Sequence, residues 1–284
     1  MKRIVVAEGM RPDLVSKQFD LDRYVRRDTC LAFRYEKEFD SHILKEIKAK
    51  GIPIIGTPRF DKIDQTVIMD RFGIKHPESF YDVKDYSCIK DTDTLNSYCD
   101  LDEFVVKPIL GARGIGVKKI TRKEFKECLY NREKVDEVFK EENKYLVSQN
   151  QDAPAYFIKD NIECMLIQEP INVVNEYRIL YFKPGFPIGY ERVKNLGQFC
   201  GNLSHGSTSR ILSSTEVADV FRPLMDQFDG LMDEYKYPWL SIDVYVDDKG
   251  NTGVFEFQME FAYEGFNHVE VRDLMVDSLN YFIK

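Results

Sequence analysis

The chain has 284 residues, of which 43% are hydrophobic, and a formal net charge of -8 at pH 7. This length and composition allow a substantial buried core and two or three compact lobes. The negative balance argues against general nucleic-acid binding, because such binding depends on Lys and Arg side chains that neutralise phosphates. We therefore expect a globular protein without a nucleic-acid partner.

The N-terminal segment MKRIVVAEG contains an apolar run of only a few residues. Such a run is too short for the core of a signal peptide or for a membrane span. The six cysteines form no C-x-x-C pair, so they indicate neither a zinc site nor a disulfide framework. We expect a cytoplasmic protein with no membrane partner.

The predicted elements begin with a small α/β lobe. Residues 3–7 (RIVVA) and 52–56 (IPIIG) are apolar runs that are typical of buried strands. Between them, residues 40–51 have apolar side chains at helical spacing and end at a glycine, which predicts a helix. The same pattern recurs in residues 61–73 and predicts a second helix there.

A glycine-rich stretch, EFVVKPILGARGIGVKKI, follows at residues 103–120. Its two ends, 104–106 and 117–120, are rich in β-branched and aromatic residues and are predicted to be strands. The loop therefore joins strand to strand and is not a dinucleotide-binding loop, which opens a helix. Two interpretations stay open. The loop is an ordinary hairpin turn, or it is a flap whose backbone N–H groups approach an anion beside Lys107 and Arg113.

Beyond the loop, Thr121 and Glu124 form a capping box that starts a charged helix predicted to run to about Asn143. Another helix is predicted over 215–235, with a kink at Pro223. A final amphipathic helix closes the chain. Further strands are predicted within 164–171, 175–182, 186–195, 240–246 and 253–260.

Three oxygen-bearing side chains stand out in the last two predicted strands. A spacing of two places Glu256 and Gln258 on one face of a strand, and an antiparallel neighbour would bring Asp243 beside them. Such oxygen ligands suit Mg²⁺. The alternative is a solvated sheet face, since acidic residues often alternate with apolar ones there. We expect Phe255, Phe257 and Met259 on the opposite, apolar face.

The order of these motifs resembles the ATP-grasp superfamily and, within it, is similar to the RimK-like carboxylate–amine ligases. The motifs are the strand lysine with its glycine flap, then IQEPINVVNEYR, ERVKN, GNLSHG, SIDVYV and FEFQ. The resemblance implies an α/β (α+β) ATP-grasp fold. In it, an N-terminal α/β lobe (1–56) precedes a central α+β lobe with the flap (57–165) and a C-terminal α+β lobe (166–284), and the last two clasp ATP.

The resemblance also implies a set of site residues. Backbone groups of Glu169 and Ile171 would bond the adenine edge, and Glu176 would reach the ribose or the cation. Nucleotide contacts are implied for Lys62, Lys107, Arg113, Gly114, Gly116, Gln168, Glu169, Ile171 and Glu176. Catalytic roles are implied for Arg178, Arg192 and Asn202, and binding of Mg²⁺ (or Mn²⁺) for Asp243, Glu256 and Gln258.

Two departures from the family pattern bear on the chemistry. Gln258 stands where the family usually has asparagine, so its carboxamide would reach the metal with one more methylene. The segment FCGNLSHG lacks the basic residue that usually precedes the asparagine, which bears on the second substrate.

The implied activity is an ADP-forming ligase that joins a carboxylate to an amine through an acyl phosphate. Its substrates would be small molecules or peptides, and a homo-oligomer is the default expectation. Two other classes stay open: a kinase that stops after phosphoryl transfer, and a catalytically silent ATP-binding module.

Overall fold

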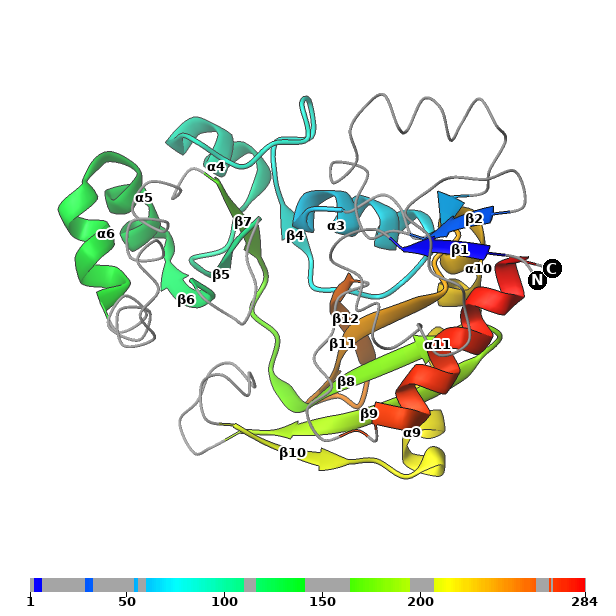
Figure 1. Cartoon of the computed structure of the whole chain (residues 1–284). Coiled ribbons are helices and arrows are strands. Elements are labelled where there is room, and N and C mark those ends of the chain that lie inside the picture. The colour runs from blue at the N-terminus through cyan, green and yellow to red at the C-terminus, as the bar shows by residue number, and fades with distance from the viewer. Residues whose placement is uncertain are drawn as a thin grey trace.

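The computed structural model describes residues 3–6, 29–32, 54–55, 60–109, 116–140, 164–194, 207–258, 266 and 268–283. These residues form three sheets with their helices, and Figure 1 shows the four-stranded sheet at one end of the molecule and the five-stranded sheet below it. No helix within these ranges is long and apolar enough to cross a membrane.

The first sheet is parallel and has the order β1-β2-β3. Its strands are β1 (Arg3–Val6), β2 (Thr29–Ala32) and β3 (Ile54–Ile55). The strands predicted within 3–7 and 52–56 are confirmed, and β2 was not predicted. The helix predicted over 40–51 lies outside the described residues.

The second sheet has four antiparallel strands in the order β4-β7-β5-β6. They are β4 (Ser79–Phe80), β7 (Met165–Gln168), β5 (Glu103–Pro108) and β6 (Lys118–Thr121). Alternation along β5 turns Phe104 and Val106 toward a core shared with α4 (Thr92–Tyr98) and the helices after β6. Lys107 therefore lies on the opposite face of this sheet.

The charged stretch after β6 forms two helices, α5 (Arg122–Tyr130) and α6 (Arg132–Val138). The predicted capping box of Thr121 and Glu124 is confirmed. The single predicted helix is wrong, because Asn131 is extended and its side chain accepts the N–H groups of Glu133 and Lys134. An asparagine that caps a new helix in this way interrupts the preceding one.

The third sheet has five antiparallel strands in the order β10-β9-β8-β11-β12. They are β8 (Val173–Phe182), β9 (Phe186–Val193), β10 (Thr208–Ile211), β11 (Trp239–Asp247) and β12 (Thr252–Gln258). All of these except β10 were predicted. The four side chains of β10 are exposed, so no alternation of apolar residues marks this strand.

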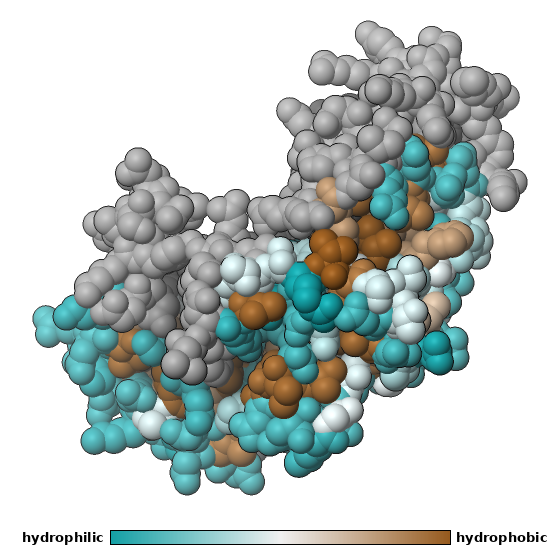
Figure 2. All heavy atoms as spheres, turned by 90° about the horizontal axis from the view of Figure 1, so that it is seen from below, coloured by the Kyte–Doolittle hydropathy of each residue, from teal (hydrophilic) through white to brown (hydrophobic). Residues whose placement is uncertain are grey.

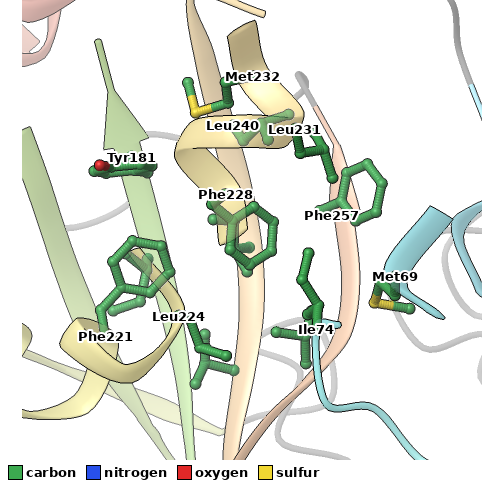
Figure 3. Close-up of a cluster of buried hydrophobic side chains, with 14 of the residues drawn as sticks. Met69, Ile74, Tyr181, Phe221, Leu224, Phe228, Leu231, Met232, Leu240 and Phe257 are labelled. Atoms are coloured by element: carbon green, nitrogen blue, oxygen red, sulfur yellow. The ribbon is translucent and has the colours of Figure 1, made fainter. Parts of the chain in front are cut away.

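One face of the five-stranded sheet packs against α9 (Ser214–Phe221), the 3₁₀ turn η4 (Arg222–Leu224) and α10 (Met225–Tyr235). A helix kinked at Pro223 was predicted here, and the irregularity at this residue is the turn η4, which separates α9 from α10. Figure 3 shows the Phe228 ring at the centre of this core, between Phe221 and Phe257. Helix α3 (Lys62–Arg71), predicted within 61–73, adds Met69 to the same core.

The opposite face of the five-stranded sheet is crossed by α11 (His268–Ile283), which runs beside β8 and β9 (Figure 1). Apolar side chains also remain on the outside, among them Phe186, Val193 and Ile211. Figure 2 shows several separate apolar groups among hydrophilic ones on the face seen from below. Scattered apolar side chains of this kind are normal on a water-facing surface.

We predict that Phe228→Ala lowers the free energy of unfolding by about 3–5 kcal/mol, because the ring is fully buried and its loss leaves a cavity. Phe186→Ala serves as the control, since this side chain is 52% exposed and its change should cost less than about 0.5 kcal/mol. Urea unfolding of both variants measures the difference. Equal losses would contradict the placement of Phe228 at the centre of the core.

Candidate functional site

On the face of the five-stranded sheet that turns away from α9 and α10, one part carries charged side chains, which we call the polar face. The register places Arg178 opposite Asp243 between β8 and β11, and Asp243 opposite Glu256 between β11 and β12. It also places Glu176 of β8 opposite Arg192 of β9. Residues directly opposite in antiparallel strands share a face, so these charged side chains meet. The predicted proximity of Asp243 and Glu256 is confirmed.

Asp243 is the centre of a buried ion-pair network. Arg178 donates to its two carboxylate oxygens from Nε and Nη2, at 2.8 and 2.9 Å. Arg192 donates from Nη2 to both oxygens at 3.0 Å, and from Nη1 to Glu176 at 2.6 Å. Lys194 lies 3.3 Å from Glu176. Charges this deeply buried are stable only when they are paired, so each side chain of the network fixes its neighbours.

The network controls the protonation of its members. Burial alone would raise the pKa of Asp243, but Arg178 and Arg192 outweigh it and lower this pKa to about 2. Burial alone would lower the pKa of Arg192, but Asp243 and Glu176 outweigh it and raise that pKa. The carboxylate and the guanidinium groups are therefore charged at neutral pH.

The three predicted cation ligands, Asp243, Glu256 and Gln258, differ in whether their side-chain oxygens are available to a cation. A carboxylate offers about four lone-pair sites, and the hydrogen bonds from Arg178 and Arg192 occupy those of Asp243. Glu256 and Gln258 are half-buried and share the polar face. Within the described ranges, no three His, Cys, Asp or Glu side chains form a group that could hold a metal. Glu256 and Gln258 fit Mg²⁺, which takes few protein ligands when phosphates supply the others.

Two lysines that were predicted to contact the nucleotide approach this face from elements outside the five-stranded sheet. Lys62 is the first residue of α3, and its Nζ lies 3.7 Å from the Glu256 carboxylate. Helix α3 is held there because Gln65 accepts the backbone N–H of Phe257 at 3.0 Å. Lys107 is buried, and its Nζ lies 4.7 Å from the centroid of the Phe255 ring. The two lysines therefore meet β12, although the sequence separates them from it by more than a hundred residues.

Phe255 corrects one expectation from the sequence. The register shifts in β12, so that Asp243 pairs with Glu256 and Val244 with Val254, and Phe255 is an extra residue. This β-bulge lets the Phe255 ring pack on Tyr245, with centroids 4.6 Å apart, rather than join the core. Phe257 does lie in the core, as expected, and Met259 is outside the described residues. Strict alternation could not reveal the bulge, and Phe255 is a site residue that the sequence analysis missed.

The predicted adenine hinge is fixed by the edge strand β4. Gln168 is buried and donates from Nε2 to Ser79 at 2.7 Å, and its Oε1 has no hydrogen-bond partner among the described residues. Ser79 in turn donates to the Pro77 carbonyl. The Glu169 N–H already donates to the Glu78 carbonyl at 2.9 Å. Since a residue has one backbone N–H, an adenine contact from the Glu169 backbone is left to its carbonyl oxygen.

The flap is described only at its C-terminal end. Gly116 has a φ of 73°, a backbone conformation that favours glycine. Ile171, the last of the predicted hinge residues, lies between β7 and β8. The other predicted flap and substrate residues lie outside the described ranges: Arg113, Gly114 and Asn202.

We predict that Arg192→Ala lowers the free energy of unfolding by about 3–5 kcal/mol, because it leaves two buried carboxylates short of a partner. Arg210→Ala is a matched control on the adjacent strand. Arg210 also bridges two carboxylates, those of Glu191 and Glu216, but its side chain is 52% exposed. Chemical unfolding should show little effect of the control. Similar losses in both variants would contradict the buried network.

No protein-family model matches this chain, and no curated protein matches it. Several solved structures are similar over almost its whole length. The D-alanyl-alanine synthetase A of Vibrio cholerae covers 100% of this chain and 99% of its own, with a TM-score of 0.58 and 10% identity. The RiPP-associated ATP-grasp ligase of Chryseobacterium gregarium, solved with ADP and a leader and core peptide, covers 99% and 97%, with a TM-score of 0.56 and 13% identity. D-cycloserine synthetase DcsG covers 99% of each chain, with a TM-score of 0.55 and 14% identity. The fold predicted from the sequence is confirmed.

Proposed function

Because the chain has the ATP-grasp fold, we propose that it is an ATP-dependent ligase that joins a carboxylate to an amine. One observation carries the proposal: four cationic side chains from separate elements converge on the adjacent strands β11 and β12. Lys62 and Lys107, from α3 and the four-stranded sheet, contact β12, and Arg178 and Arg192 contact Asp243 of β11. Four cationic side chains from separate elements suit a polyphosphate that lies between the two sheets.

The nucleotide would bind along this line of cations. Lys62 and Lys107 would contact the phosphates, and the flap residues Arg113, Gly114 and Gly116 would close over them. The hinge of Gln168, Glu169 and Ile171 would bond the adenine edge. Glu176, which is already paired with Arg192 and Lys194, would reach the ribose hydroxyls.

The chemistry would follow from charge placement. A substrate carboxylate oxygen attacks the γ-phosphorus of ATP, ADP leaves, and an acyl phosphate forms. The amine nitrogen then attacks the acyl carbon, phosphate leaves, and the amine loses a proton. Arg178 and Arg192 would stabilise the spreading negative charge. Asn202 would face the acceptor substrate. A cation held by Glu256 and Gln258 would supply further charge neutralisation.

The substrate class is proposed from the similar structures. Their names include an alanyl-alanine synthetase and a ligase solved with a peptide, so we propose an amino acid or peptide as the carboxylate or amine. Another similar structure, the ATP-grasp ligase PsnB (TM-score 0.55, 11% identity), was solved with Mg and ADP, which supports Mg²⁺ as the cation, and we propose Mn²⁺ as a substitute. A RimK-like subtype, a cytoplasmic location and a homo-oligomer stay predictions.

The test is ADP release from ATP and Mg²⁺ with a library of amino acids, peptides and other carboxylates. A ligase releases ADP only when both a carboxylate and an amine are present, and the product mass equals their sum minus water. ADP release with an alcohol as the only acceptor, together with phosphorylation of that alcohol, would show that the protein is a kinase and not a ligase. Nucleotide binding without turnover across the library would favour the silent module.

We predict that Lys107→Ala binds an ATP analogue at least about tenfold more weakly while it stays folded, because a buried cation facing phosphates has no replacement in a methyl group. Lys123→Ala on α5 is the control, since the Lys123 side chain is 85% exposed. Calorimetric titration of both folded variants measures the affinity. Unchanged binding by Lys107→Ala would contradict the phosphate role of this lysine.

A further inference from the structure

The two carboxylates that face each other across β11 and β12 have different surroundings. Asp243 is buried and accepts four hydrogen bonds from two arginines. The Glu256 side chain is 25% exposed, and the Lys62 Nζ lies 3.7 Å from its carboxylate. The two residues are direct neighbours in the register, but Asp243 lies on β11 between β8 and β12, whereas Glu256 lies on β12 at the end of the strand order. The arginine partners from β8 and β9 therefore reach Asp243.

We propose that Asp243 is a positioning residue that holds Arg178 and Arg192 toward the transferred phosphoryl group, and that Glu256 is the carboxylate that ligates the cation. This inference rests on the proposed ligase function. It replaces a three-ligand metal site with Glu256 and Gln258 as the protein ligands.

The hydrogen-bond geometry carries the first step. Direct ligation needs a lone pair on a carboxylate oxygen, and those of Asp243 are directed at guanidinium donors. A cation at Asp243 would have to displace at least one arginine. The displaced guanidinium would be a buried charge beside the incoming cation, which is unfavourable for both.

The orientation of the arginines carries the second step. Asp243 accepts hydrogen bonds from Nε and Nη2 of Arg178, which lie on one edge of the guanidinium group. The Nη1 group of Arg178 lies on the other edge and points away from Asp243. A planar guanidinium can serve two partners in this way, one carboxylate and one phosphate oxygen. Arg192 is fixed at both ends, by Asp243 and Glu176. The carboxylate thus determines the direction in which Arg178 offers its remaining donors.

A measurement on the wild-type protein tests the arrangement directly. In a protein labelled with ¹⁵N-arginine, the Nε–H signal of Arg178, assigned by its loss in Arg178→Lys, should exchange slowly with water. The proposal expects the signal to keep this protection after Mg²⁺ and the non-hydrolysable analogue AMPPNP are added. Loss of protection on adding both would show that the carboxylate has left the arginine for the cation, and would overturn the proposal.

Metal affinity provides the second test. Electron paramagnetic resonance of free Mn²⁺, with saturating AMPPNP, measures cation binding to each variant. Glu256→Gln should weaken it by on the order of tenfold, because affinity follows the number of charged ligands. Asp243→Asn, confirmed as folded by circular dichroism, should keep the Mn²⁺ affinity and lose ADP formation. A loss of Mn²⁺ affinity in Asp243→Asn equal to that in Glu256→Gln would overturn the proposal.

Ligand binding by the wild-type protein distinguishes failure of the ligase function from failure of the role of Asp243. A wild-type protein that binds neither AMPPNP nor Mn²⁺ would overturn the ligase proposal together with this inference. A wild-type protein that binds both, but loses the Arg178 protection on binding, would overturn only the role of Asp243.

Discussion

The paired burial of Asp243 with Arg178 and Arg192 is the constraint on which the polar face of the five-stranded sheet depends. A lone buried charge is costly, so three strands must present these side chains at matching positions. The opposite face of the same strands carries the apolar core against α9 and α10. Each strand thus satisfies two demands at once, which is why its register cannot slip by one residue.

The polar face is completed by elements from the other half of the chain. Helix α3 contributes apolar side chains to the core of the five-stranded sheet, and it also places Lys62 3.7 Å from the Glu256 carboxylate. Gln65 binds the backbone of β12, so the helix and the strand are held at one relative position. The site therefore depends on a helix whose apolar residues alone would indicate nothing more than packing.

Sequence patterns located those parts of the fold that are governed by local chemistry. The capping box at Thr121 follows from side-chain oxygens, and the irregularity at Pro223, predicted as a kink, follows from a missing N–H; both are found. Strands β8, β11 and β12 were recognised from their β-branched and aromatic residues. The pairing of Asp243 with Glu256 followed from spacing and an antiparallel neighbour.

Features that depend on tertiary context escaped the sequence analysis. Strand β10 has exposed side chains and is defined by its backbone bonds to β9. Asn131 could continue a helix or cap the next one, and the charge pattern is similar on either side of it. The arginine partners of Asp243 come from two other strands, so no spacing within one segment reveals that its oxygens are occupied.

The extra residue in β12, Phe255, changes which side chains share a face of the sheet. In a regular strand, residues two apart share a face. Val254 and Glu256 lie on opposite faces although they are two residues apart, and Phe255 stands between them as an insertion into the ladder. Phe255 has no partner in the register with β11, so the pairs that place Val254 and Phe257 in the core and Glu256 beside Asp243 do not involve it. Position 255 can therefore change its side chain, or vary in evolution, and alter the surroundings of Lys107 while the core register of the sheet stays the same.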